Sequence, residues 1–101
     1  MGERRRCTEA EIEAGLRELV DWKVIEGKLR RELGFKDFVQ AFSFMTTMAF
    51  YAESRNHHPE WFNVYNRLVI ELSTHDIGGI SSFDFDFAKQ VDALYSRASG
   101  G

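Results

Sequence analysis

The chain has only three histidines, His57, His58 and His75. Histidine is the side chain best suited to exchange protons near neutral pH, so these residues are the first candidates for acid–base chemistry. His57 and His58 are adjacent and directly precede Pro59, the single proline, while His75 follows a segment of alternating apolar residues. An acid and a base on either side of a small molecule could come from such a cluster. A structural, hydrogen-bonded role for each histidine stays open on composition alone.

Other catalytic chemistries find weaker support in the sequence. Two histidines and a carboxylate could bind zinc, but adjacent histidines tend to point apart and no His-x3-His or cysteine partner is present. The single cysteine, Cys7, lies near one end, and the chain has no Gly-x-Ser-x-Gly elbow that would present a nucleophile. Gly78-Gly79 lacks the spacing of either phosphate-binding glycine fingerprint. A metal site is therefore the less favoured alternative.

Length and composition predict one small domain over residues 1–101, with residues 1–7 and 97–101 expected to be flexible. Thirteen basic and sixteen acidic side chains give a net charge of −3, which argues against direct nucleic-acid binding. The longest uncharged run, residues 38–52, is too short to span a bilayer, and no signal peptide is evident. One cysteine cannot form an internal disulfide, so we expect a cytoplasmic setting.

The elements that must position the histidines follow from hydrophobic periodicity. Thr8 is expected to cap a first helix, with Glu11 completing a capping box. Residues 22–33 predict a β-hairpin, with its strands on either side of Glu26-Gly27. Residues 64–74 predict the clearest strand, with a break or a bulge at Tyr65-Asn66 between it and a shorter strand. A last helix is expected from Ser81, with Asp84 as a capping partner and with its buried side at Phe83, Phe87, Val91 and Leu94.

Between the strands, residues 35–55 predict a long helix with more apolar surface than a small monomer can cover. One apolar stripe has helical spacing, and further apolar side chains lie outside it; the stripe is Phe38, Ala41, Phe42, Met45, Met48, Ala49 and Ala52, and the others are Val39, Phe44, Phe50 and Tyr51. We therefore expect this helix to pack against other subunits as well as its own sheet. Simple burial between the sheet and the terminal helices is the alternative.

The order of elements, α-β-β-α-β-β-α, favours an antiparallel α+β domain over a parallel sheet. Two further interpretations concern neighbours of the histidines. Trp61 and Phe62 are expected to be core anchors of the short strand rather than platforms for a substrate, and Ser81 with Asp84 is expected to be a helix cap rather than a catalytic pair.

Several motifs together resemble the pterin-4a-carbinolamine dehydratase family over most of the chain. The motifs are Glu53-Ser-Arg-Asn-His57-His58-Pro59-Glu60-Trp61-Phe62-Asn63-Val64-Tyr65-Asn66, then Leu72-Ser73-Thr74-His75-Asp76, then Gly79-x-Ser81-x-x-Asp84. The resemblance extends to Trp22 with Glu26-Gly27 and to Phe35-Lys36-Asp37-Phe38. Asn56 stands where many relatives have Asp, which keeps hydrogen bonding and removes a negative charge beside the histidine pair.

The resemblance implies a hydro-lyase that dehydrates 4a-hydroxytetrahydropterin to quinonoid dihydropterin and water during tetrahydropterin recycling. It implies no cofactor and no metal. The fold it implies is a four-stranded antiparallel sheet with three helices packed on one face, assembled into homodimers or homotetramers through the long helix.

The resemblance also suggests roles for particular residues. His58 and His75 would be acids for the two faces of the carbinolamine, and His57 would bind the pterin and accept a proton. Glu53 would orient a histidine or carry its charge. The substrate-binding set would be completed by Asn56, Ser73, Thr74 and Asp76, with Trp22 as an apolar or stacking wall.

Two other functions remain as alternatives. Some animal relatives bind the dimerisation region of a homeodomain transcription factor through the same long helix, so the chain could be an interaction protein with a nuclear role. It could also be a pterin-binding protein of another pterin pathway, although the intact histidines His57, His58 and His75 argue against an inactive enzyme.

Overall fold

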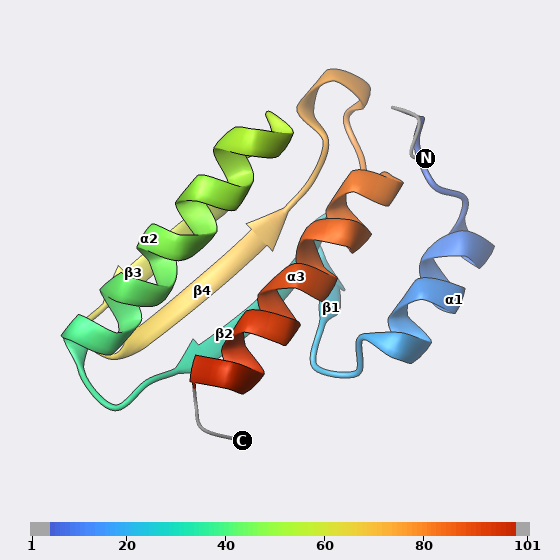
Figure 1. Cartoon of the computed structure of the whole chain (residues 1–101). Coiled ribbons are helices and arrows are strands. Elements are labelled where there is room, and N and C mark those ends of the chain that lie inside the picture. Colours follow the sequence, from blue (N-terminus) through green and yellow to red (C-terminus); the bar gives the residue numbers. More distant parts are fainter. Residues whose placement is uncertain (1–4, 99–101) are drawn as a thin grey trace.

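Three helices and four strands make up the computed structural model, which describes residues 5–98. In chain order the elements are α1 (Glu9–Glu18), β1 (Lys23–Ile25), β2 (Lys28–Gly34), α2 (Phe38–Arg55), β3 (Glu60–Val64), β4 (Arg67–Leu72), the short 3-10 helix η1 (His75–Ile77) and α3 (Ser82–Ala98). The strands form one antiparallel sheet in the order β1-β2-β4-β3, and the helices lie on one side of it (Figure 1). The predicted α+β fold and element order are confirmed. The ends expected to be flexible fall mostly on residues 1–4 and 99–101, outside the described residues.

Two tight hairpins set the strand register. Glu26 and Gly27 join β1 to β2 with φ angles of 53° and 78°, the left-handed geometry that two-residue hairpin turns require. Tyr65 and Asn66 join β3 to β4, and Tyr65 also has a positive φ of 53°. The predicted break is therefore a hairpin, and the long strand begins at Arg67 rather than residue 64.

Alternation along β2 and β4 builds the core. Successive side chains of a strand point to opposite faces, so every second residue faces the helices. The sheet contributes five side chains to the core, each at most 2% exposed: Leu29, Leu33, Leu68, Ile70 and Leu72. Among the described residues, no helix covers the opposite face of the sheet (Figure 1). Phe62 lies on that open face and is 58% exposed, so its predicted core role is wrong, whereas Trp61 packs against the core as expected.

The side chains that the long helix α2 buries differ in part from the predicted apolar stripe. Its buried residues are Ala41, Phe44, Met48 and Ala52, which follow i, i+3 and i+4 spacing. Phe38 and Phe42, expected in the stripe, are about half exposed, while Phe44, expected outside it, is 3% exposed. Two adjacent apolar rows run along the helix, and periodicity alone does not decide which row faces the sheet.

The terminal helices complete the layer over the sheet. Thr8 and Glu11 form the predicted capping box of α1, and the Arg5 guanidinium, hydrogen-bonded to the same carboxylate, lowers the pKa of Glu11 to about 2. Gly15 lets α1 approach α3 closely, because an added Cβ would lie 2.4 Å from the Phe85 ring. The buried apolar side chains on α3 are Phe85, Phe87, Ala88 and Val91, while Phe83 and Leu94 are only partly buried. Within residues 5–98, no helix is long and apolar enough to cross a bilayer.

Candidate active site

The end of α2 determines how the adjacent histidines are presented. Asn56 ends the helix in the left-handed conformation, with φ 51° and ψ 44°, and asparagine tolerates that conformation better than most residues. The N–H of His57 then donates to the Ala52 carbonyl at 3.1 Å, and Pro59 prevents the helix from continuing. The chain therefore reverses at this point, and the two imidazoles separate: His57 is buried, whereas the His58 side chain is 56% exposed.

One surface hollow brings all three histidines together. It has a volume of about 330 Å³ and is bounded by the loop after α2, the start of β3 and the segment that follows β4. The lining residues are Asn56, His57, His58, Pro59, Glu60, Ser73, His75 and Asp76. Six of the residues predicted to bind or act on a substrate therefore line one cavity.

His57 is anchored from behind by a buried carboxylate. Its Nε2 lies 2.6 Å from Oδ1 of Asp84, and Asp84 is fully buried. The second oxygen of Asp84 accepts from the Thr74 hydroxyl and from the Ser81 N–H, each at 2.9 Å. Thr74 and Ser81 are themselves linked through their hydroxyls at 2.6 Å. The predicted cap at the start of α3 is present, and the same carboxylate also holds a histidine.

The network fixes the chemistry of His57. An ionised carboxylate has no hydrogen to donate, so Nε2 of His57 must carry the proton that lies between the two groups. In the neutral imidazole the other nitrogen, Nδ1, is then the acceptor. From the sequence, Asp84 was expected only to cap the last helix, and its contact with His57 was not predicted. One signal was available in the sequence. A helix cap at this position uses only one oxygen of the Asp84 carboxylate, which leaves the other oxygen free to bind a second side chain.

The two exposed histidines also face carboxylates. Nε2 of His58 lies 3.0 Å from Oε1 of Glu53, the residue predicted to orient a histidine. Nε2 of His75 lies 3.4 Å from Oε2 of Glu60, a residue that was not among the predicted site residues. A hydrogen bond from Lys28 lowers the pKa of Glu60, so this carboxylate stays ionised. Each of the three histidines is thus paired with an acidic side chain.

Two predicted substrate-binding residues do not line the hollow. Thr74 is buried behind it and acts on His57 only through Asp84. Trp22 is 3% exposed, and its indole N–H donates to Oδ1 of Asp92 on α3 at 2.9 Å, which makes it a core residue that ties the β1 end of the sheet to α3.

The geometry of the described residues gives little support to a cysteine nucleophile or to a metal site. Burial raises the pKa of the Cys7 thiol, and the Glu11 carboxylate adds to this effect, so the reactive thiolate is disfavoured. Across residues 5–98, no group of three or more histidine, cysteine, aspartate or glutamate side chains is arranged to hold a metal ion.

The sequence and the fold both match one family of known proteins. The family model described as pterin 4 alpha carbinolamine dehydratase matches residues 5–94, and the chain belongs to this family. A protein of Solibacter usitatus, named provisionally as a pterin-4-alpha-carbinolamine dehydratase, is 57% identical over 89 residues, which are 88% of this chain and 94% of the relative. A Synechococcus protein with the same provisional name is 54% identical over 76 residues, which are 75% of this chain and 82% of the relative.

A solved structure shows the same fold. The crystal structure of a Brucella melitensis protein, described as a transcriptional coactivator/pterin dehydratase, superposes with a TM-score of 0.85. The two chains are 42% identical, and the match covers 89% of this chain and 98% of the Brucella chain. Membership of this family supports the interpretation of the chain as a dehydratase.

Proposed function

We propose that the chain dehydrates 4a-hydroxytetrahydropterin to quinonoid dihydropterin and water in tetrahydropterin recycling. The observation that carries the proposal is one hollow lined by three histidines, each of which is paired with a carboxylate: His57–Asp84, His58–Glu53 and His75–Glu60. The hollow of about 330 Å³ is at the lower end of the range for small-molecule sites, which suits one bicyclic ring. Membership of the family supplies the substrate class.

The reaction needs one acid and one base, with no change of oxidation state. The C4a–O bond breaks as an acid protonates the departing hydroxyl, which leaves as water. A base removes the proton of N5, and the electron pair of that N–H bond forms the C4a=N5 double bond. Each positioned group contributes roughly 10²–10⁴-fold to the rate.

Geometry supports a division of roles among the histidines. His58 and His75 are assigned as the acids for the two faces of the carbinolamine, because both are exposed at the hollow and can take up a proton from water after each turnover. His57 is assigned to pterin binding and proton acceptance through Nδ1, because Asp84 engages its Nε2. Glu53 orients His58.

The remaining polar lining is assigned to pterin binding. Asn56, Ser73 and Asp76 border the same cavity as the histidines. Thr74 contributes indirectly, through Asp84. Trp22 receives no substrate contact in this proposal, because its ring is buried and its N–H is engaged by Asp92.

The direct test is the rate of dehydration of freshly generated 4a-hydroxytetrahydropterin. His58→Ala and His75→Ala should each lower kcat by roughly 10²–10⁴-fold. Lys89→Ala, an exposed change on α3 away from the hollow, is the control and should keep the wild-type rate. Wild-type rates in both histidine variants would show that the acid roles are wrong.

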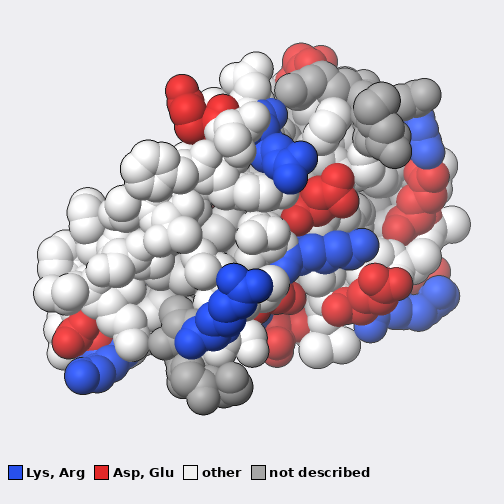
Figure 2. Space-filling model, viewed as in Figure 1, with Lys and Arg blue, Asp and Glu red and all other residues white. Residues whose placement is uncertain are grey.

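A second proposal concerns assembly, because α2 has a large apolar surface facing solvent. Val39, Phe42 and Phe50 are 71%, 54% and 73% exposed, and few charged side chains lie over this part of the surface (Figure 2). We propose that α2 joins subunits into a homodimer or homotetramer. The coactivator part of the Brucella description makes a helical partner, such as the dimerisation region of a homeodomain transcription factor, the alternative occupant.

Sedimentation of matched valine variants tests the assembly proposal. Val39→Asp on α2 should lower the mass, whereas Val20→Asp, which changes an even more exposed valine outside α2, should leave the mass unchanged. Equal masses for both variants and the wild type would exclude α2 as the interface. A mixed complex that replaces the homo-oligomer on addition of a helical partner would favour the alternative.

The cytoplasm is the proposed location, since a single cysteine makes no use of an oxidising compartment. A nuclear pool is expected only if a transcription-factor partner exists. Imaging of the tagged full chain tests both statements.

A further inference from the structure

Glu60 links the histidine hollow to the open face of the sheet. It is the first residue of β3, directly after Pro59, and both of its carboxylate oxygens have partners. Oε1 accepts from Nζ of Lys28 at 2.7 Å, while Oε2 faces Nε2 of His75 at 3.4 Å. Glu60 also borders a second hollow, of about 340 Å³, on the open face.

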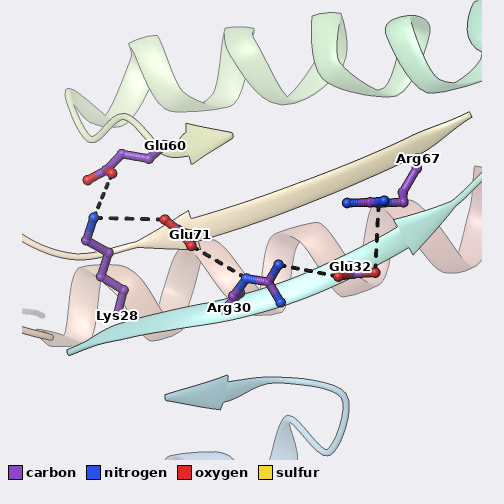
Figure 3. Close-up of polar contacts among 6 residues, drawn as sticks. All are labelled: Lys28, Arg30, Glu32, Glu60, Arg67 and Glu71. Atoms are coloured by element: carbon purple, nitrogen blue, oxygen red, sulfur yellow. Dashed lines mark hydrogen bonds and ion pairs between the residues drawn. The ribbon is translucent and has the colours of Figure 1, made fainter. Parts of the chain in front are cut away.

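Beyond Glu60, ion pairs continue across the open face. Figure 3 shows side chains of alternating charge from β3, β2 and β4 that form one connected ladder. After Glu60 and Lys28 the contacts are Lys28–Glu71 at 3.9 Å, Glu71–Arg30 at 3.5 Å, Arg30–Glu32 at 3.3 Å and Glu32–Arg67 at 3.9 Å. The histidine end of the ladder is at Glu60, and Arg67 lies at the opposite end.

Strand register explains why Lys28 matters for Glu60. Glu60 and Glu71 are direct partners in the β3–β4 register, and like charges directly opposite each other destabilise a sheet. The ammonium group of Lys28 contacts both carboxylates and offsets this repulsion. The hydrogen bond between Lys28 and Glu60 raises the pKa of Lys28 and lowers the pKa of Glu60.

His75 is the histidine with the least support from its surroundings. Its side chain is 77% exposed on the one-turn helix η1, so packing does not fix the ring. Glu60 is the partner that the structure gives to its Nε2. A catalytic group must be held near its productive geometry by neighbouring side chains if it is to act efficiently.

We propose that Glu60 is a positioning residue that holds the His75 imidazole at the rim of the hollow, and that Lys28 holds Glu60 in place. The proposal rests on the proposed dehydratase function, because it assigns Glu60 a part in the same reaction. Glu60 acts through His75 and transfers no proton to the pterin itself.

Kinetics of matched variants test the proposal. Glu60→Ala should lower kcat roughly tenfold and change KM less than twofold, the pattern for a group that aids the chemical step without binding substrate. Lys28→Met should lower kcat in the same direction, and Lys28→Arg should restore it. Glu32→Ala is the control, because Glu32 is a similarly exposed carboxylate further along the same ladder. Equal kcat values in Glu60→Ala and Glu32→Ala would overturn the proposal.

A double-mutant cycle separates positioning from a general loss of stability. If Glu60 acts through His75, Glu60→Ala should cause no further loss of kcat in a His75→Ala background. A purely structural effect would lower kcat by the same factor in both backgrounds, and that result would contradict the proposal.

An NMR measurement without substrate distinguishes failure of this inference from failure of the proposed function. The imidazole resonances of His75 should shift in Glu60→Ala and Lys28→Met but stay in place in Glu32→Ala. Such shifts in a chain without dehydratase activity would support the positioning of His75 and reject the function. Unmoved His75 resonances in an active enzyme would reject the positioning and leave the function standing.

Discussion

Replacing Asp84 with asparagine changes one atom in the buried network behind His57. The side chain keeps its shape, but one carboxylate oxygen becomes an NH₂ group. The Ser81 N–H and the Thr74 hydroxyl both donate to Oδ2, so the amide oxygen of Asn must occupy that position. The NH₂ group then faces Nε2 of His57, which has to accept, and the proton moves to Nδ1.

The size of the effect follows from this change of tautomer. Nδ1 is the atom that we assign to proton acceptance, and a protonated Nδ1 cannot accept. Loss of one general base corresponds to roughly 10²–10⁴-fold in kcat. The exchange also replaces one hydrogen bond of a fully buried charged group, and such bonds contribute about 1.5–3 kcal/mol to the free energy of unfolding.

The assay combines three measurements on Asp84→Asn and a control. Stopped-flow rates of carbinolamine dehydration give kcat, urea unfolding gives stability, and long-range ¹H–¹⁵N spectra give the tautomer of His57. Asp86→Asn is the matched control, because it makes the same chemical change two positions along α3 at an exposed site. A folded Asp84→Asn protein with the wild-type rate and the wild-type tautomer would refute the role of Asp84.

Two further predictions concern stability. Trp22→Phe removes the indole donor to Asp92 and should lower the free energy of unfolding, measured in urea, by about 1–3 kcal/mol. The KM for the pterin should not rise. A raised KM would show that Trp22 contacts the substrate. The Arg5 guanidinium lowers the pKa of Glu11 in the folded state to about 2, whereas the pKa of an unfolded glutamate is about 4.3. This pairing therefore stabilises the fold fully at pH values above about 4.3, and the stabilisation is lost as the pH falls from about 4.3 to about 2. Glu11→Gln should reduce the acid sensitivity of unfolding between those values, and an unchanged pH profile would contradict the pairing.

Features that depend on neighbours in sequence were predictable. The capping box at Thr8 and the hairpin turn at Glu26-Gly27 rest on a few adjacent residues each, and both are present. At Tyr65-Asn66, where a break or a bulge was expected, the chain makes a hairpin turn. The fold class followed from the order of such elements. Local backbone chemistry also explains why His57 and His58 separate, since Asn56 and Pro59 reverse the chain around them.

Features that depend on docking between distant elements were not predictable. The His57–Asp84 contact spans 27 residues and forms only because α3 packs against the end of α2. Trp22 and Asp92 are 70 residues apart, so the core position of the indole could not be told from a substrate-facing one. On α2, the periodicity predicted the apolar rows but not which row faces the sheet. Phe42 was expected to be buried and is exposed, whereas Phe44 was expected outside the stripe and is buried.

The most direct test of the central claim is a crystal structure of the chain with a stable pterin, such as a dihydropterin that cannot be dehydrated. The ring should lie in the hollow lined by His57, His58 and His75, with C4a within reach of His58 or His75 and a polar edge against Asn56 or Ser73. A pterin bound elsewhere, for example on the open face of the sheet near Phe62, would contradict the assignment of the histidine hollow as the site of dehydration.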